Sequence, residues 1–215
     1  MQNILRNYEY LLATIRALPH NAGPKIVAID GRGGSGKSTI ARNIQAISDD
    51  VTIVQMDDLY RPSSERPGNA LDLPPGSSFD WPRLEREVLQ PLRHGRPAAF
   101  RRYDWESDTL QEVISVKAAG IVVVEGCYSM LPELLPWFDF TIWVECDAAT
   151  CLERGIARSG EAEREIWTTE WAPLEDRYIE QQRPMSRAQL IINTNDDSGF
   201  AVETGVQFLQ LLPDS

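Results

Sequence analysis

Apolar residues are spaced along this chain in two ways, and the difference predicts which segments are helices and which are strands. At the start, apolar positions recur at helical spacing from residue 4 to residue 18, which predicts an amphipathic helix ended by Pro19. We expect this helix to pack on the edge of a sheet. Elsewhere apolar positions form continuous runs without polar alternation, as parallel strands buried on both faces require. The predicted strands are residues 25–30, 51–56, 121–124, 140–144 and 190–192.

Helical patterns and turn-rich segments alternate with these strands. Helices are predicted at residues 38–48, from Pro82 to about 89–92, at 148–157 and at 164–182, and a last apolar segment follows at 208–212. Pro, Gly, Ser and Asn crowd residues 61–78, which predicts a long exposed loop, while residues 97–105 and 112–116 predict a two-stranded flap. The alternation predicts an α/β fold, in which helices cover both faces of a parallel sheet.

The composition fits one domain with a sizeable core, since 42% of the 215 residues are hydrophobic and 25% are charged. Within residues 1–215 we expect an N-terminal helix at 1–20, an insertion with the flap at 61–116, and a lid with the helix that follows it at 148–183. The three cysteines, Cys127, Cys146 and Cys151, show no metal-like spacing and are predicted to be buried thiols.

The charge of the chain excludes some partners. A formal net charge of −11 and a pI near 4.7 argue against a nucleic-acid partner, because the phosphates would be repelled. We find no apolar run long enough to span a membrane and no signal-peptide pattern at the start, so we expect a cytoplasmic protein without a membrane partner. The composition leaves open whether the chain forms a homo-oligomer. A polyanionic ligand would need a local cluster of Arg and Lys.

One glycine-rich segment between the first strand and the next helix predicts a phosphate site. It has the pattern G-x-x-x-x-G-K-[ST], in which glycines let backbone N–H groups turn toward phosphate oxygens. Lys37 adds a mobile positive charge, and the Ser38 hydroxyl is suited to Mg²⁺. The helix that follows adds its positive N-terminal end. The predicted phosphate-binding residues are Gly31, Gly33, Gly34, Ser35, Gly36, Lys37, Ser38 and Thr39.

The same segment also satisfies a dinucleotide pattern. Gly31-x-Gly33-x-x-Gly36 matches that fingerprint, and Asp57 lies about 20 residues beyond it, where a ribose-binding acid is expected. Spacing alone does not separate the two interpretations. Lys37 and Ser38 favour a triphosphate with its metal, because a bound pyrophosphate needs neither. An NAD(P)-dependent oxidoreductase therefore remains an alternative.

Acidic residues follow two of the predicted strands, at the edge where ligands of parallel sheets gather. A carboxylate at Asp57 could accept the proton of a substrate hydroxyl, although an Asp that opens a loop can also bond to its own backbone, and Asp58 favours that role. Glu125 ends an apolar strand, where a carboxylate commonly reaches Mg²⁺ directly or through water.

Arginines on the predicted lid supply the local positive charge. Arg154 and Arg158 lie one turn apart on one helix face, with Arg164 close behind. Two cations at this spacing repel, which favours an anion between them, although a solvated helix face remains an alternative.

Two clusters place an acid between aromatic residues beside the long loop and the flap. They are Phe79-Asp80-Trp81-Pro82 and Tyr103-Asp104-Trp105. Aromatic faces can hold a planar base, and carboxylates can accept hydrogen bonds from ribose hydroxyls. Alternatively, the rings belong to the core and each Asp caps a turn, as Asp80 before Trp81-Pro82 would do well.

Taken together, these motifs resemble the uridine kinase-like family of P-loop kinases, in the family's order, from about residue 25 to residue 193. The resemblance implies a P-loop NTPase three-layer sandwich with a five-stranded parallel sheet, a lid helix and a small substrate-side flap, and it implies ATP with Mg²⁺ as donor. It makes Asp57 the catalytic base. By the same resemblance, Ser38 and Glu125 match metal-side residues, Arg154 and Arg158 match lid arginines, and Tyr60, Phe79, Asp80, Tyr103 and Trp105 match the nucleoside pocket. We add Arg164 to the substrate-binding residues and Lys37 to the catalytic ones.

Some segments differ from authentic uridine kinases. Those enzymes carry a His a few residues beyond the Tyr-Asp-aromatic motif, whereas this chain has Asp108 there. Residues 61–78 and 167–175 resemble a bacterial branch of the family, and Asp57-Asp58-Leu59-Tyr60 is similar to nicotinamide riboside kinases. Residues 193–195, after the last strand, are our choice for the adenine contact.

The sequence thus predicts an ATP-dependent kinase that phosphorylates a hydroxyl of a small molecule, in the first place a nucleoside. Nicotinamide riboside or another small polar alcohol is an alternative acceptor. An NAD(P)-dependent oxidoreductase and a nucleotide-binding regulator without turnover are the alternatives from other classes.

Overall fold

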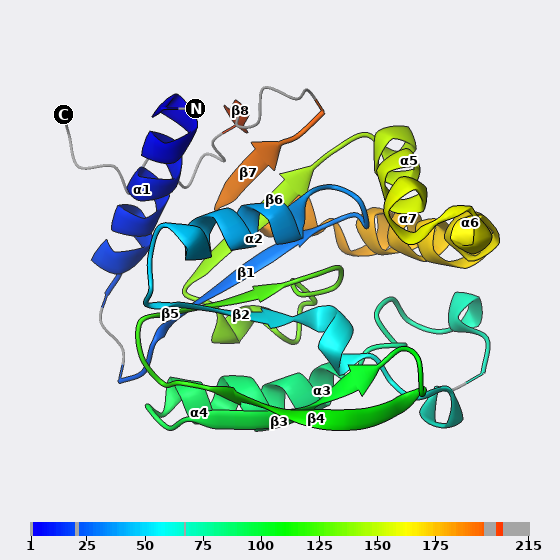
Figure 1. The fold of residues 1–215 in the computed structure, drawn as a ribbon, viewed down its shortest axis with the longest axis horizontal. Helices are drawn as coiled ribbons and strands as arrows, with labels where there is room; N and C mark the ends of the chain where they lie inside the picture. The colour runs from blue at the N-terminus through cyan, green and yellow to red at the C-terminus, as the bar shows by residue number, and fades with distance from the viewer. Residues whose placement is uncertain (1, 20–21, 67, 196–200, 204–215) are drawn as a thin grey trace.

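A central parallel sheet organises the computed structural model, which describes residues 2–19, 22–66, 68–195 and 201–203 (Figure 1). The strands of this sheet are β1 (Lys25–Gly31), β2 (Val51–Gln55), β5 (Ile121–Glu125), β6 (Phe140–Glu145), β7 (Leu190–Asn193) and β8 (Ala201–Glu203). Their order is β2-β5-β1-β6-β7-β8, and the first five strands run parallel. The predicted five-stranded parallel sheet is therefore confirmed.

Strand β8 adds an antiparallel edge that the sequence did not predict. It pairs with β7 over three residues, Ala201 to Glu203. A three-residue strand is too short to show a hydrophobic period, so the pattern gave no signal for it. The apolar segment predicted at residues 208–212 lies outside the described residues.

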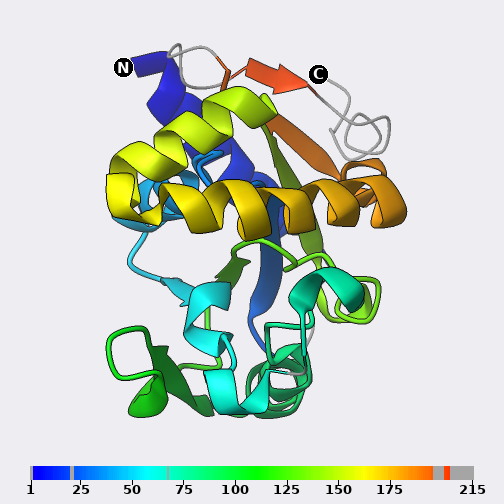
Figure 2. The ribbon, with the colours of Figure 1, turned by 90° about the vertical axis from the view of Figure 1, so that its right-hand side faces the viewer.

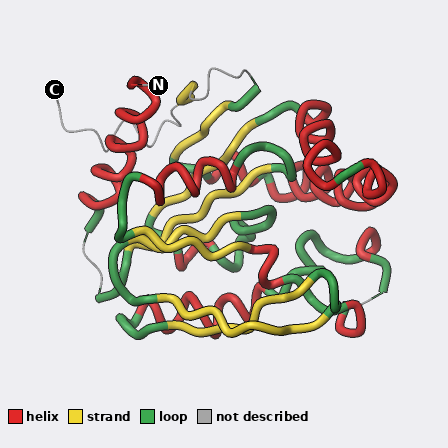
Figure 3. Tube along the Cα trace, viewed as in Figure 1, coloured by secondary structure: helices red, strands yellow, loops and turns green. Residues whose placement is uncertain are grey.

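The central strands are buried on both faces, which explains their unbroken apolar runs. Every residue of β1 and of β5 is buried. Along β1, Ile26 and Ala28 belong to one hydrophobic cluster, and Val27 and Ile29 belong to the other. Because side chains alternate across a strand, these clusters are the two faces of the sheet. Figure 3 shows the strands enclosed between helices.

Two helices cover the face that carries Val27 and Ile29. They are α1 (Gln2–Ala17) and α2 (Lys37–Ala46), which follows the glycine loop. Helix α1 contributes Tyr8, Leu11, Leu12 and Ile15 to the cluster on that face. The helix was predicted correctly, but the prediction that it packs on the edge of the sheet is wrong. Its apolar stripe meets a buried face, because an edge strand offers too little apolar surface for four inward-facing side chains.

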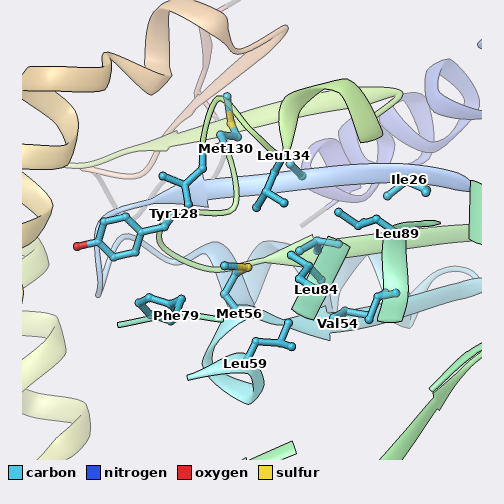
Figure 4. Close-up of a cluster of buried hydrophobic side chains, with 14 of the residues drawn as sticks. Ile26, Val54, Met56, Leu59, Phe79, Leu84, Leu89, Tyr128, Met130 and Leu134 are labelled. Atoms are coloured by element: carbon cyan, nitrogen blue, oxygen red, sulfur yellow. The ribbon is translucent and has the colours of Figure 1, made fainter. Parts of the chain in front are cut away.

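The opposite face is covered by a helix from Trp81 to Arg93 and by a hairpin. The helix consists of α3 (Trp81–Leu84), a π-helical turn (Glu85–Leu89) and α4 (Gln90–Arg93), and its residues pack with Ile26 and Val54 of the sheet (Figure 4). The hairpin joins β3 (Ala98–Asp104) to β4 (Thr109–Val116) as an antiparallel pair. The predicted flap is therefore present.

The lid helices lie across the carboxyl ends of the strands. They are α5 (Ala148–Ser159), α6 (Arg164–Ile166) and α7 (Ala172–Gln182), with a π-helical turn (Trp167–Trp171) between the last two. Figure 2 shows the long helix from α6 to α7 crossing in front of the sheet, with α5 above it. No helix within the described part of the chain is long and apolar enough to cross a membrane.

Candidate active site

A cavity of about 720 Å³ opens at the carboxyl ends of the strands. The glycine loop, the ends of β2 and β5, the lid helices and the long loop before α3 contribute to its walls. Parallel sheets bind their ligands at this edge. The cavity therefore collects most of the residues that the sequence singled out, and it has a phosphate end and an aromatic end.

The glycine loop folds so that its last glycine opens helix α2. Gly36 lies at the N-cap with φ 95°, a left-handed conformation that only glycine adopts at low cost. The backbone N–H groups of Thr39 and Ile40 bond back to the Gly36 carbonyl. The positive end of α2 is thus directed into the cavity, where it favours an anion.

Lys37 keeps its charge although it is buried. Its Nζ donates to the Arg32 carbonyl at 2.6 Å and lies 3.5 Å from the Cys127 sulfur. Burial by itself lowers the pKa of Lys37, but the carboxylates around the amine, Glu175, Glu125 and Asp30, contribute to raising it to about 12. A lysine that stays protonated at neutral pH can attract phosphate oxygens.

Ser38 and Glu125 meet at the phosphate end. Ser38 Oγ donates to Glu125 Oε2 at 3.1 Å, and only 4% of Glu125 is exposed. Burial raises the pKa of Glu125, while the charge of Lys37 and the Ser38 hydrogen bond lower it. In the described part of the chain, no group of three or more His, Cys, Asp or Glu residues could hold a metal. One hydroxyl and one carboxylate fit Mg²⁺, which binds few protein ligands alongside substrate phosphates.

Asp57 and Asp58 lie in a 3-10 turn that follows β2, and their side chains have different surroundings. Asp57 is solvent-accessible and lines the cavity, but the walls around it desolvate the carboxylate and raise its pKa, against the charges of Lys37 and Arg158. Asp58 lies outside the cavity lining. Desolvation raises the pKa of Asp58 to about 6, while the charge of Arg102 lowers it. Of the two, Asp57 alone lines the cavity.

Of the three candidate arginines, the two on helix α5 reach the cavity. Arg154 lines it and donates from Nη1 to the Thr194 carbonyl at 3.0 Å. Arg158 also lines it and lies close enough to Asp57 to lower the pKa of that carboxyl. Arg164 does not reach the cavity: it forms an ion pair with Glu161, three residues earlier, and its side chain is 54% exposed.

Aromatic residues form the other end of the cavity. Tyr60 and Trp105 stack with their ring centroids 4.7 Å apart and 29° between their planes, and 51% of Trp105 is exposed. The Trp171 ring lies edge-on to Trp105 at 6.4 Å, so the lid also contributes to this end. The aromatic residues that line the cavity as a whole are Tyr8, Tyr60, Phe79, Trp105, Tyr128, Trp167 and Trp171.

Asp80 and Tyr103 lie behind this aromatic surface and do not line the cavity. Asp80 caps helix α3 by accepting from the Arg83 N–H at 3.2 Å, and it pairs with the Arg61 side chain at 3.1 Å. Its carboxylate therefore fills the capping role. Tyr103 is buried, with its hydroxyl 2.7 Å from Asp108.

Asp108 joins the tip of the hairpin to the long loop. Its carboxylate accepts from the Ser63 N–H at 2.9 Å, from the Ser63 hydroxyl and from the Tyr103 hydroxyl. These hydrogen bonds, those of Ser63 first, lower the pKa of Asp108 to about 2. The residue at the place of the expected His thus holds the hairpin tip and the long loop together.

Comparisons with known proteins agree with this geometry. The sequence pattern of the phosphoribulokinase/uridine kinase family matches residues 26–197. The chain belongs to this family. It is 26% identical over 188 residues to the uridine kinase of Ureaplasma urealyticum, covering 80% of this chain and 90% of that one.

Solved structures share the fold. A possible uridine kinase from Bacillus stearothermophilus superposes with a TM-score of 0.67 at 23% identity, covering 87% of this chain and 98% of that one. The D-glycerate 3-kinase of Cryptococcus neoformans superposes with a TM-score of 0.71 at 14% identity, covering 95% and 98%. The protein is thus a P-loop kinase of the phosphoribulokinase/uridine kinase family, and membership of this family favours the triphosphate interpretation of the glycine loop over the dinucleotide one.

Several residues of the kinase cavity were missed as site residues, among them Glu175, Trp171 and Tyr128. Glu175 reaches it from α7, Trp171 from the π-helical turn before α7, and Tyr128 from the segment after β5. The backbone of Tyr128 has a φ of 68°, which is rare for an aromatic residue. A sequence pattern does not reveal such a conformation, so the residue was not singled out. Cys127 was predicted to be a buried thiol but is half-buried and lines the cavity, whereas Cys146 and Cys151 are buried. Burial raises the pKa of Cys127 well above its usual value, so it stays a neutral thiol.

Proposed function

We propose that this kinase transfers the γ-phosphoryl group of ATP, bound with Mg²⁺, to a hydroxyl of a small acceptor with a planar ring, in the first place a nucleoside. The observation that carries the proposal is the position of Asp57. This carboxylate lines the same cavity as the phosphate loop and the stacked pair Tyr60 and Trp105. A base placed between a phosphate site and an aromatic site can direct a hydroxyl of the acceptor toward the phosphate chain.

The phosphate end would bind the donor. The backbone N–H groups of the glycine loop and the positive end of α2 favour the phosphates, and the Lys37 amine adds a full charge. Ser38 and Glu125 are the residues that would hold Mg²⁺, which would neutralise negative charge on the phosphate chain. Arg154 and Arg158 reach the cavity from the lid and would stabilise the charge that spreads over the transferred group.

Asp57 would act on the acceptor hydroxyl. Its carboxylate accepts the proton as the acceptor oxygen bonds to phosphorus and the bond from phosphorus to the leaving oxygen of ADP breaks. A carboxylate accepts that proton only when it is ionised, so this step requires a working pH above the raised pKa of Asp57. Asp58, one residue later, does not line the cavity and has no part in this step.

The aromatic end supports an acceptor with a flat ring. Trp105 and Trp171 expose ring surface on which a base can stack, while the buried Tyr60 ring supports Trp105 from one side. The same surface suits the cationic ring of nicotinamide riboside through cation–π attraction, which makes that compound the second candidate. A small alcohol without a ring would leave this aromatic surface unused.

A screen of acceptors tests the proposal directly. ADP formation is measured with ATP and Mg²⁺ against nucleosides, nicotinamide riboside, ribose and glycerate, each alone. We expect a nucleoside or nicotinamide riboside to stimulate ADP release far above the rate without acceptor, and ribose to give little. Stimulation by glycerate or ribose alone would contradict the planar acceptor, and no stimulation by any hydroxyl compound would favour a nucleotide-binding regulator.

A further inference from the structure

Helix α7 directs three side chains at the strand and loop that carry the phosphate site. Glu175 Oε1 accepts a hydrogen bond from the Gly33 N–H at 2.9 Å. Asp176 pairs with the Arg32 side chain at 2.7 Å, and the Tyr178 hydroxyl donates to Asp30 at 2.8 Å. The first of these contacts differs from the other two, because it occupies a backbone N–H group of the phosphate loop itself.

Glu175 is an unusual group to find at this position. It is buried, with 8% of its surface exposed, and it lines the cavity. Besides the Gly33 N–H, the same oxygen accepts from the Cys127 thiol at 3.2 Å, and its charge acts on Lys37. A buried carboxylate is stable only when hydrogen bonds and opposite charges compensate for the water it has lost. Here the phosphate loop supplies that compensation.

The packing around this contact leaves little spare room. A Cβ at Gly33 would lie 2.7 Å from the Trp167 ring and 2.9 Å from Glu175 Oε1. The Trp167 ring also lies against Gly155 of the lid helix, where an added Cβ would be 2.6 Å from it. Trp167 therefore packs between the glycine loop and the lid helix α5. A movement of Glu175 would disturb this packing and so would shift the lid.

A phosphate chain needs the groups that Glu175 now uses. Loop N–H groups and Lys37 are the partners of nucleotide phosphates in this motif. Two anions cannot share one N–H group and one ammonium in a cavity with limited water, because their repulsion is only weakly screened there. Either the Glu175 carboxylate moves away from these groups, or its negative charge weakens the binding of the nucleotide.

We propose that Glu175 is an internal ligand of the phosphate loop that the phosphate chain of the nucleotide displaces, so that this carboxylate sets the affinity of the kinase for nucleotides. The inference rests on the proposed binding of ATP at this loop. It assigns Glu175 a positioning role: the residue holds the loop and the lid together until phosphate takes its place. Because the Glu175 carboxylate and the phosphates repel each other electrostatically, the effect on affinity grows with the number of phosphates on the nucleotide.

The variant Glu175→Gln isolates the charge. Glutamine has the same shape, and its carbonyl oxygen can still accept from the Gly33 N–H. Dissociation constants for ATP, ADP and AMP are measured by isothermal titration calorimetry on the full chain. We expect ATP to bind about fivefold more tightly to the variant, ADP to gain less, and AMP to change by less than about twofold. A matched control is Glu180→Gln, which removes the same charge from an exposed position on the same helix and should change none of the three.

The graded effect separates this role from a merely structural one. Equal changes for the three nucleotides, an unchanged constant for ATP, or weaker binding of ATP would overturn the proposal. Glu175→Ala removes the acceptor as well as the charge, and we expect it to tighten ATP binding at least as much while lowering the melting temperature. Tighter ATP binding by the Gln variant without any acceptor-stimulated ADP release would leave this inference standing and overturn the proposed function alone.

Discussion

The two ends of the cavity are built in different ways. The phosphate end comes from one continuous segment, residues 31–39, and from side chains at the carboxyl ends of β2 and β5. The aromatic end comes from separate segments, with Tyr60 and Phe79 at the borders of the long loop, Trp105 on the hairpin and Trp171 in the π-helical turn of the lid. The first is fixed by the backbone of the sheet, whereas the second depends on how loops meet.

This difference separates two tasks. Residues that follow buried strands are held by the core, as Glu125 is at the end of β5, so the groups that act on phosphate are placed firmly. Side chains on loops can change without disturbing the sheet, and they are suited to selecting an acceptor. Substitutions at the phosphate end should therefore lower kcat, and substitutions at the aromatic end should raise the KM for the acceptor.

Asp57→Asn is expected to have the largest effect. Asparagine keeps the shape of the side chain but cannot accept the proton, so we expect kcat to fall about 10²–10⁴-fold while the dissociation constant for ATP stays nearly the same. The matched control is Asp58→Asn, whose carboxylate lies outside the cavity lining, and it should keep kcat within about threefold. A joint loss of kcat and ATP binding in Asp57→Asn would show that Asp57 is structural or only a metal ligand.

The pH dependence of kcat sharpens the same point. Desolvation raises the folded pKa of Asp57 above its ordinary 3.8, and a base works only when ionised. The acid limb of the kcat profile should therefore lie above pH 3.8, with about a tenfold fall per pH unit below the pKa. Arg158 lowers this pKa, so Arg158→Ala should move the limb to higher pH in addition to lowering kcat. A limb that stays in place would separate Arg158 from Asp57.

Trp105→Ala tests the aromatic end. Loss of the ring that stacks on Tyr60 should raise the KM for the acceptor about tenfold, equivalent to about 1.4 kcal/mol, and leave the KM for ATP unchanged. Trp105→Phe keeps an aromatic face and should restore most of the affinity. Val113→Ala, at a position 57% exposed on the same hairpin, is the control for a general effect on the flap. If kcat falls and the KM of the acceptor does not change, the two ends are not separate in function.

The phosphate end could be predicted from sequence because its signals are local. The glycine pattern, Lys37 and Ser38 lie within nine residues, and Asp57 and Glu125 directly follow recognisable buried runs. Parallel strands end at the same edge, so five buried runs were enough to bring these groups together.

The aromatic end and the lid contacts could not be predicted in the same way. Glu175 meets Gly33 across 142 residues, and no periodic pattern reports such a contact. For Asp80 and Arg164 the sequence did hold a signal. Asp80 precedes a helix with Pro near its start, as a cap does, and Arg164 has Glu161 three residues before it, as a surface ion pair does. These local uses compete with a binding role, and the structure shows the local use for both.

Asp108→Asn is expected to have the smallest effect. Asp108 has φ 52°, and Asn tolerates this left-handed conformation well, so the substitution removes the charge with little backbone strain. The Asn side chain keeps one acceptor oxygen for Ser63 and loses the other, which should loosen the hairpin tip. We expect the KM of the acceptor to rise about twofold to fivefold, with kcat and the KM of ATP unchanged. Asp104→Asn is the control, because Asp104 bonds only within the hairpin turn among the contacts described, accepting from the Ser107 N–H at 3.0 Å.

Acid should reproduce this loosening in the unsubstituted chain. The folded pKa of Asp108, about 2, lies below the ordinary 3.8, so the carboxylate contributes stability above pH 3.8 and loses that contribution as the pH falls from 3.8 toward 2. The group is exposed, so the contribution is small and screened by salt. Hydrogen exchange at the Ser63 N–H, which donates to this carboxylate, should therefore quicken relative to the core across that window in the unsubstituted chain and not in Asp108→Asn. Equal exchange in both proteins would mean that the Asp108 carboxylate does not hold the loop. The stacked rings alone would then maintain the structure of the aromatic end.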